Sequence, residues 1–312
     1  MLKKMMNAIR VYQYGGPEVL KYEKIPCPEP KEGEVLIRVH SVGVLPVDWK
    51  IRQGLFKDVR TIQFPYIPGT VFSGVVEDVG ANVITYRKGQ HVFGRSTMGT
   101  YAEFIVVSKE SLVHKPLSIS FNDAATISGG AATAWQALIH DGRLKAGERV
   151  LIHGAAGGVG SYAVQFAKWK GAHVIGTASP ENTDFVHSLG AETVIDYTST
   201  PFEQVIKDVD LVIDTVGGDT LERSWSVVKS GGTLISLLEQ PSLEKANKRG
   251  IKALKPNRLS TIADLKDIAQ LMEEGIVKAI ISKTFPLHEV RRAHEVSQIG
   301  HGRGRIILHI AN

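Results

Sequence analysis

Cysteine is almost absent from this sequence. The 312 residues include a single cysteine, Cys27, so no disulfide can form within the chain, as is typical of a reducing compartment. A lone cysteine also excludes zinc sites built from several thiolates. No apolar run approaches the roughly 18 residues of a membrane helix. The N-terminal MLKKMMNAIR lacks the apolar region of a secretory signal. We therefore expect a cytoplasmic protein.

Neither sign of charge dominates the chain. It has 37 lysines and arginines against 32 acidic residues, a formal net charge of +5. The basic residues are scattered and are not interleaved with aromatic ones, which argues against a nucleic-acid surface; a basic patch formed only on folding stays open. With 43% hydrophobic residues the chain can bury a sizeable core, and its length suggests about two domains.

Residues 149–170 have the pattern of a short buried strand, a glycine-rich turn (HGAAGGVG) and a largely buried helix. Glycine there allows a sharp bend, a close approach to a pyrophosphate and tight packing of helix on strand. The helix N-terminus presents N–H groups to the phosphates. The alternative is a tight turn without ligand, which the continuing strand–helix alternation disfavours. The predicted binding residues are Gly154, Ala156, Gly157, Gly158, Val159 and Gly160.

The patterns on either side of this motif differ. Residues 8–115 contain short β-branched runs between glycine and proline turns, which predict a compact antiparallel barrel. A helix is expected to open at 122–125 and to resume at 133–139 after a break at Gly129 and Gly130. A doubly wound parallel sheet is expected to follow, with strands at 150–153, 173–177, 193–196, 210–214 and 232–237 and helices near 160–170, 181–188 and 219–229.

The last part of the chain returns to the β-rich style. A helix near 260–274, a strand at 279–285, a helix at 288–298 and a strand at 304–310 are expected. We predict an α/β protein in which 1–118, completed by 259–312, forms one domain and 119–258 forms a dinucleotide-binding Rossmann domain.

The end of the second predicted strand bears on the choice of cofactor. In this fold an acidic residue there binds the ribose 2′-hydroxyl of NAD, but the strand ends in Thr177, Ala178 and Ser179. The missing carboxylate favours NADPH, whose 2′-phosphate Ser179 and Asn182 could bind. Helix capping is the alternative role for both. No arginine or lysine is near in sequence, so any cationic clamp must come from elsewhere in the chain.

Further cofactor contacts are expected where later strands end, because the carboxyl ends of parallel strands line the ligand crevice. These are Thr215 and Val216 after one strand and Ser236 at the end of the next. A simple turn is an equally good explanation for each residue alone. His40, His91 and His153 stand at the edges of predicted strands, and we expect structural roles for them.

Eight motifs are spread in order over nearly the whole chain: YGGPEVL, PVDWKIRQG, PYIPGTVFSGVVEDVG, GTYAEFIVV, TAWQAL, HGAAGGVG, DTVGG and GHGRGRIIL. Together they resemble the zinc-independent, quinone oxidoreductase-like branch of the medium-chain dehydrogenase/reductase superfamily, in the order of that family. The resemblance implies a GroES-like barrel, a Rossmann domain and a tail that rejoins the barrel. It also implies NADPH and a quinone or an activated carbon–carbon double bond as acceptor.

The resemblance also assigns individual residues. Thr133 matches a threonine near the nicotinamide, and Tyr197 matches a tyrosine that packs against the adenosine 2′-phosphate. Lys50 resembles a lysine proposed to hold the substrate carbonyl, where its ammonium would stabilise an enolate; a solvated surface lysine is the alternative. Leu45 and Asp48 are expected in the substrate pocket. Many relatives have asparagine where Leu45 stands, so we expect a more apolar pocket.

Zinc-dependent relatives place a cysteine in the loop that holds Leu45 and a His-Glu pair where this chain has Thr70 and Val71. The chain also lacks their cysteine-rich lobe. No metal is therefore expected. A zinc alcohol dehydrogenase is the least favoured of three hypotheses, because alcohol oxidation needs a Lewis acid to polarise the alcohol oxygen.

The main functional hypothesis is an NADPH-dependent reductase of quinones or α,β-unsaturated carbonyls. A non-catalytic NADPH-binding sensor or nucleic-acid-binding protein on the same fold is the alternative. The resemblance further implies a homodimer, for which residues 250–255 are the candidate edge strand.

Overall fold

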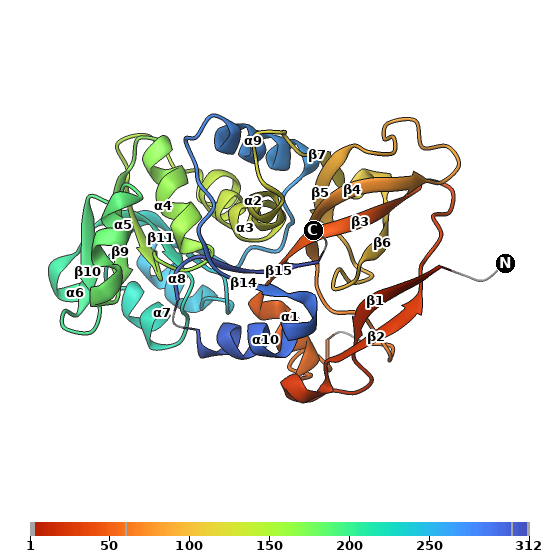
Figure 1. The fold of residues 1–312 in the computed structure, drawn as a ribbon. Coiled ribbons are helices and arrows are strands. Elements are labelled where there is room, and N and C mark those ends of the chain that lie inside the picture. Colours follow the sequence, from red (N-terminus) through yellow and green to blue (C-terminus); the bar gives the residue numbers. More distant parts are fainter. Residues whose placement is uncertain (1–3, 60, 301, 311–312) are drawn as a thin grey trace.

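The computed structural model describes residues 4–59, 61–300 and 302–310 of the chain. They form two lobes side by side, a β-rich one around a seven-stranded sheet and an α/β one around a six-stranded sheet (Figure 1). The first and last parts of the sequence meet in the β-rich lobe. This two-part α/β architecture confirms the predicted fold class.

The β-rich lobe is mainly antiparallel. Its sheet runs in the order β14-β15-β3-β4-β5-β7, with β6 paired to β3, and β1 and β2 form a separate hairpin. Its core contains mainly valine, isoleucine and leucine, and in β3 and β4 consecutive residues are buried. The strands are β1 Met5–Arg10, β2 Lys21–Pro26, β3 Glu34–Val44, β4 Val71–Val79, β5 His91–Arg95, β6 Phe104–Ser108, β7 Leu112–His114, β14 Ile281–Pro286 and β15 Arg305–His309.

The α/β lobe has a parallel sheet in the order β10-β9-β8-β11-β12-β13. The order reverses next to β8, so the crevice beyond its carboxyl end is a topological switch point. The strands are β8 Arg149–His153, β9 His173–Ala178, β10 Thr193–Asp196, β11 Val209–Asp214, β12 Val228–Ser236 and β13 Lys252–Leu254.

Helices cover both faces of the parallel sheet, and shorter ones join the two lobes (Figure 1). The longer helices are α4 Gly160–Trp169, α9 Ile262–Glu273 and α10 Val290–Ile299. The shorter ones are α1 Pro46–Arg52, α2 Phe121–Thr126, α3 Ala132–Trp135, α5 Thr183–Ser188, α6 Phe202–Val205, α7 Asp219–Ser224 and α8 Leu243–Arg249. No helix within the described residues is long and apolar enough to cross a membrane.

Two expected elements differ from the structure. The helix predicted over 219–229 ends at Ser224, because the Val209 N–H donates to the Val227 carbonyl at 2.9 Å and draws this part of the chain into the sheet. The predicted helix break at Gly129 and Gly130 is a π-helical segment, η3 Ile127–Ala131, that joins α2 to α3. The chain therefore stays helical there, as π-helical turns often do next to functional sites.

The tail joins both lobes. β15 pairs with β3 in the β-rich sheet, as expected. Leu265 and Ile268 of α9, however, belong to the hydrophobic cluster that fills the α/β lobe. The exact domain limits, 1–118 with 259–312 and 119–258, stay a prediction.

Candidate functional site

A cleft of about 680 Å³ lies beyond the carboxyl ends of the parallel strands. Its wall combines the glycine loop, the ends of β9 and β11, the start of α1 and the tail before β15. Twelve of the predicted binding or pocket residues line it: Leu45, Thr133, Gly154, Ala156, Gly157, Gly158, Val159, Ser179, Asn182, Tyr197, Thr215 and Val216. The structure thus brings most of the sequence-predicted site together.

The glycine loop leaves β8 and enters α4 by a tight turn. Gly154 has a φ of +67°, and a Cβ there would lie 2.5 Å from the Thr215 Oγ1. A Cβ on Gly160 would lie 2.1 Å from the Gly154 carbonyl oxygen. Gly160 therefore serves the close packing of helix on strand and does not line the cleft. The first N–H groups of a helix have no acceptor within it, so the start of α4 suits an anion.

The tail crosses this loop just before β15 begins. The Gly304 N–H donates to the Ala156 carbonyl at 2.9 Å, and Gly304 and Gly157 form a parallel bridge. Gly304, between the two arginines, has a φ of +59°, so the chain bends there and the side chains on either side of it point in different directions. Arg303 reaches the end of β9, whereas Arg305 lies against the glycine loop.

Arg305 is a buried cation beside the cleft, with 7% of its surface exposed. Its Nε has no hydrogen-bond partner among the described residues. A Cβ on Gly158 would lie 2.6 Å from that Nε, and one on Gly130 would lie 2.4 Å from the Nη2. Burial lowers the pKa of the guanidinium to about 10. The side chain needs glycine on both sides, and it has hydrogen-bonding capacity left for a ligand.

At the end of β9, Arg303 supplies the cation that the local sequence lacks. Its Nε donates to the Asn182 Oδ1 at 2.6 Å, and its Nη2 donates to the Glu181 carbonyl at 2.5 Å. The Asn182 amide donates in turn to the Ser179 hydroxyl at 2.9 Å. This contact could not be predicted from the local sequence, because 121 positions separate Arg303 from Asn182. The arginines of the tail motif GHGRGRIIL were the available signal.

Glu181 opposes this positive charge. It also lines the cleft, and its carboxylate accepts a hydrogen bond from the Ser179 hydroxyl at 2.6 Å. That bond, followed by the N–H of Glu181 itself, lowers the pKa of the carboxyl. The sequence placed Glu181 beyond the binding region, on the next helix. The structure instead places it in the short 3₁₀ turn η5 Pro180–Asn182, within the site.

The other end of the cleft is less polar. Leu45 and Leu237 line it together with Thr133, whose hydroxyl donates to the Gly129 carbonyl at 2.8 Å. A Cβ on Gly129 would lie 3.1 Å from the Leu45 Cδ2, so the leucine side chain packs directly on the π-helical segment. This end has the apolar character expected from Leu45.

Besides Gly160, three predicted site residues lie outside the cleft. The Ser236 hydroxyl donates to the buried Asp214 at 2.9 Å. The Asp48 carboxylate accepts from the Leu45 N–H at 2.8 Å and from the Tyr101 hydroxyl at 3.0 Å, which holds the start of α1. Lys50 lies on α1 with its Nζ 5.5 Å from the ring centre of Trp49. The roles of these residues toward a ligand stay predictions.

The three strand-edge histidines have neighbours that suit structural roles. His153 is fully buried, and its two ring nitrogens lie 3.1 Å from the Thr177 hydroxyl and 3.0 Å from the Ser224 hydroxyl. His40 and His91 both pack on the ring of Phe121. Burial lowers the pKa of His40 and of His153 to about 4. Both rings are therefore neutral at neutral pH.

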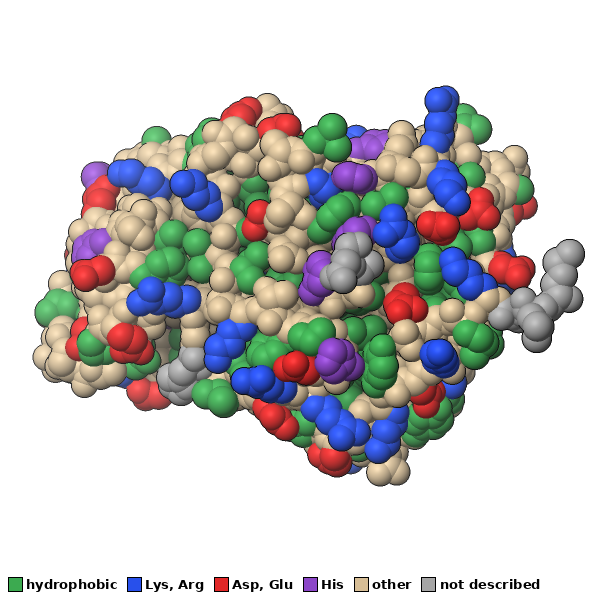
Figure 2. All heavy atoms as spheres, viewed as in Figure 1, with side chains coloured by type: hydrophobic (Ala, Val, Ile, Leu, Met, Phe, Trp, Pro, Cys, Tyr) green, Lys and Arg blue, Asp and Glu red, His purple; other side chains and the backbone are tan. Residues whose placement is uncertain are grey.

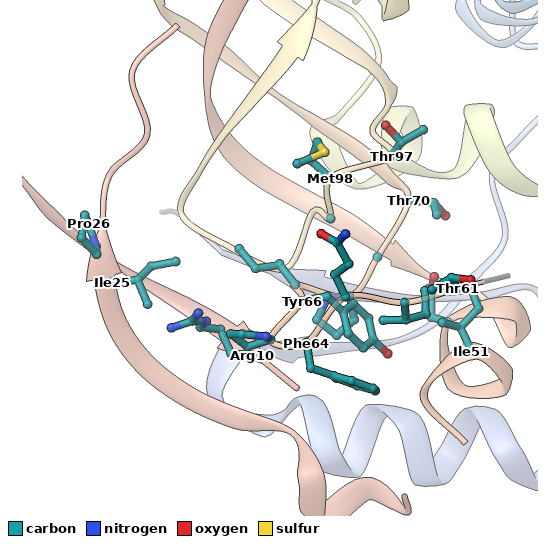
Figure 3. A pocket seen from close by; sticks show the side chains of 18 residues that line it. Arg10, Ile25, Pro26, Ile51, Thr61, Phe64, Tyr66, Thr70, Thr97 and Met98 are labelled. Carbon is teal, nitrogen blue, oxygen red and sulfur yellow. The ribbon is translucent and has the colours of Figure 1, made fainter. Parts of the chain in front are cut away.

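A second cavity, of about 780 Å³, lies within the β-rich lobe. It is formed by the β1–β2 hairpin, α1, residues 61–70 and residues 97–99, with Arg10, Phe64 and Tyr66 among its lining side chains (Figure 3). It shares no lining residue with the cleft. The Arg10 guanidinium is paired with the Glu23 carboxylate at 3.3 Å.

The resemblance places the zinc ligands of zinc-dependent relatives in the loop 45–48, which begins with Leu45, and at the positions of Thr70 and Val71. Neither an alkyl side chain nor a threonine hydroxyl is a usual zinc ligand. Among the residues that the structure describes, no three or more His, Cys, Asp or Glu side chains come together as a metal site. The residues present at this place do not fit a catalytic zinc.

Comparisons with known proteins agree with the fold and the cleft. Residues 31–117 match the alcohol dehydrogenase GroES-like domain, and residues 189–308 match a zinc-binding dehydrogenase domain. Human quinone oxidoreductase is 35% identical over 97% of this chain and 96% of its own length. The chain therefore belongs to the medium-chain dehydrogenase/reductase family, among the quinone oxidoreductase-like proteins.

Two solved structures extend the likeness to three dimensions. The quinone oxidoreductase of Coxiella burnetii superposes with a TM-score of 0.91, at 34% identity over 99% of this chain and all of the other. The Escherichia coli quinone oxidoreductase, solved in complex with NADPH, gives a TM-score of 0.90 at 28% identity over 97% of this chain and 99% of the other. The chain is thus an oxidoreductase of this family with a nicotinamide cofactor.

Proposed function

We propose that this protein is an NADPH-dependent reductase that transfers hydride, without zinc, to a quinone or to an α,β-unsaturated carbonyl compound. One observation carries the proposal. Arg305 and Arg303 flank the glycine loop and reach toward two different parts of the same cleft. Two cations at different places in one cleft could bind two phosphate groups of one ligand, the diphosphate and the 2′-phosphate of NADPH.

The residues of the cleft fit this cofactor. The Arg305 side chain, which lines the cleft, and the N–H groups at the start of α4 would hold the diphosphate. Arg303, Asn182 and Tyr197 would hold the adenosine end. Thr133 would position the reactive ring beside Leu45. When bound, NADPH supplies the hydride. The chain would contribute binding, orientation and an apolar wall that excludes water from the acceptor.

The cofactor preference can be tested through two opposed charges. Arg303→Ala should raise the KM for NADPH about tenfold, the effect of losing one charge-assisted hydrogen bond, and should leave the KM for NADH nearly unchanged. Glu181→Gln should act in the opposite sense and favour NADPH further. Arg87→Ala, at an exposed position away from the cleft, controls for net charge. A protein that prefers NADH and loses that preference in Glu181→Gln would contradict the NADPH assignment.

The acceptor is proposed from the apolar end of the cleft and from the names of the relatives. Leu45 and Leu237 can face the ring of a quinone or the double bond of an enone but cannot polarise an alcohol oxygen. The purified protein should therefore oxidise NADPH with a simple quinone or enone and should show no alcohol oxidation. Oxidation of a panel of alcohols, abolished by a chelator, would contradict zinc independence.

The oxyanion role of Lys50 is a separate proposal that rests on the resemblance. Because Lys50 does not line the cleft, the role requires its side chain to turn from Trp49 toward the acceptor. Lys50→Ala should then lower kcat about a hundredfold, as for other lost oxyanion donors, with little change in the affinity for NADPH. Lys57→Ala, a variant of an exposed lysine, is the control. An unchanged kcat would remove the role and leave the reductase.

Two observations bear on assembly and on the nucleic-acid alternative. β13 is the last strand of the parallel sheet, so its outer edge can pair with a second copy, which supports the proposed homodimer. On the face shown in Figure 2, basic and acidic side chains are interspersed and form no broad basic surface. Light scattering that gives a monomer mass would exclude the dimer. Binding of duplex DNA at physiological salt would favour the alternative.

A further inference from the structure

A smaller cavity of about 180 Å³ lies next to the apolar end of the cleft. Thr133 and Leu237 line both spaces, so the small cavity begins where the acceptor is proposed to bind. Its other lining residues are Arg95, Ala132, Gln136, Pro256, Arg258, Leu259 and Ser260. It therefore combines cationic and amide groups at the end of an otherwise apolar path.

Two arginines face this cavity without a carboxylate to neutralise them. Arg95, at the end of β5, is half-buried, and its Nε donates to the Ser128 carbonyl at 2.5 Å. Burial lowers the pKa of its guanidinium. Arg258 is exposed, in the segment between β13 and α9. Within the described parts of the chain, neither arginine has an ion-pair partner. Two cations from distant parts of the sequence thus share one small space.

The third polar residue of the cavity is buried as well. Gln136 is only 6% exposed and lines the cavity. Its amide nitrogen can donate to a group bound there. The Ser260 hydroxyl, in contrast, already donates to the Ala132 carbonyl at 2.7 Å.

We infer that this cavity binds an anionic group carried by the acceptor, so that the preferred substrate is a quinone or enone with a carboxylate on a short side chain. The inference deepens the proposed function and rests on it. Arginine offers a planar pair of N–H donors that matches a carboxylate, and the Gln136 amide can donate alongside. The cavity is too small to take in the ring of the acceptor. It would therefore hold only the anionic group, while the ring and its electrophilic carbon stay in the cleft beside Thr133.

The test compares one acceptor in two forms, a quinone with a propanoate side chain and the matched propanamide. Their redox-active rings are the same, so a difference between them reports the charge. Affinity for the protein loaded with NADP⁺ is measured first, by equilibrium titration, and kcat/KM with NADPH second. In the unmodified protein the acid should be favoured at least about tenfold in both, the effect of one charge-assisted contact.

Arg258→Gln should reduce that preference several-fold and leave the amide unchanged, and Arg95→Gln should do the same. Arg87→Gln, at an exposed position away from the cavity, should have no effect. Arg258 is exposed, so its variant keeps the test valid if Arg95→Gln does not fold. A phosphonate analogue that outcompetes the acid would identify a phosphate-bearing acceptor instead.

The two proposals fail in different ways. Equal affinity for the acid and the amide, or a preference that survives both substitutions, would overturn the anionic cavity and leave the reductase in place. If neither compound is reduced but the acid still binds about tenfold better than the amide through these arginines, the cavity stands and the reductase assignment fails.

Discussion

Two cavities of this protein differ in what their polar side chains do. The larger one, in the β-rich lobe, includes Asp48, whose carboxylate is held by the Leu45 N–H and the Tyr101 hydroxyl, and Arg10, which is paired with Glu23. The smaller one, between the lobes, includes Arg305, whose Nε has no partner among the described residues. Volume alone would therefore select the wrong candidate.

What separates the two cavities is hydrogen-bonding capacity left open. A buried polar group without a partner destabilises the fold by about 1–3 kcal/mol, so it usually has a reason to be there. At the cleft, Gly130 and Gly158 also leave room for Arg305, because a Cβ at either position would collide with its side chain. At the larger cavity, the polar contacts fix the start of α1. We therefore assign cofactor binding to the cleft and a structural role to the polar groups of the larger cavity.

Arg305→Met tests the assignment of the cleft as the binding site most directly, because it keeps the length of the side chain and removes its charge. Affinity for NADPH and for NADH should both fall about a hundredfold, because the diphosphate is common to both and its partner would be lost. The thermal midpoint of the free protein should rise, since an uncompensated buried cation is replaced by an apolar group. Titration calorimetry and differential scanning calorimetry measure the two effects.

The Arg305 prediction has a matched control. Arg52→Met removes another buried arginine, one that donates to the Gln298 side chain at 2.9 Å and lies outside the cleft. It should leave cofactor affinity unchanged, whatever its effect on stability, because its Nε and Nη1 also have no partner among the described residues. An Arg305→Met protein that loses stability and still binds the cofactor normally would show that Arg305 is structural and would reverse our assignment of the two cavities.

A second prediction uses the glycines. Gly158→Ala should weaken cofactor binding about tenfold, because the new Cβ would lie 2.6 Å from the Arg305 Nε and displace the side chain. In an Arg305→Ala background the same change should cost little further affinity, since the space is then free. The four proteins form a double-mutant cycle. Fully additive effects would mean that the glycine serves the cofactor directly and not Arg305.

A third prediction concerns the supporting lobe. Tyr101→Phe removes the hydroxyl that donates to Asp48 and lies 3.2 Å from the His294 Nε2. We expect a loss of about 1–3 kcal/mol of unfolding free energy, as for other buried polar groups left without a partner, and a cofactor affinity within about twofold of the original. Denaturant unfolding and NADPH titration check this. A large loss of affinity at unchanged stability would place the site in this lobe.

The sequence predicted the architecture and the glycine loop because both depend on local patterns. Apolar runs, turn glycines and strand–helix alternation are set within about ten to twenty residues. Arg303 and Arg305 were missed as binding residues because they reach the loop only through the return of β15, about 145 positions after Gly158. For the same reason, the sequence did not predict that Asp48 and Ser236 lie outside the cleft. Their partners are chosen by packing between segments, which no single stretch of sequence records.

The smallest expected effect concerns acid stability of the supporting lobe. Burial, helped by the nearby Arg52, lowers the pKa of His294 from 6.5 to about 3. The unfolded histidine binds a proton near its ordinary pKa and the folded one does not. The contribution of His294 to stability is therefore fully present above pH 6.5 and falls as the pH drops toward 3.

Between about pH 7 and pH 5, His294→Gln should lose fewer degrees of thermal midpoint than the original protein. His288→Gln, at an exposed position, should show the original slope. Equal slopes in all three proteins would show that His294 takes up its proton over the same pH range in the folded and the unfolded state, so that burial does not lower its pKa.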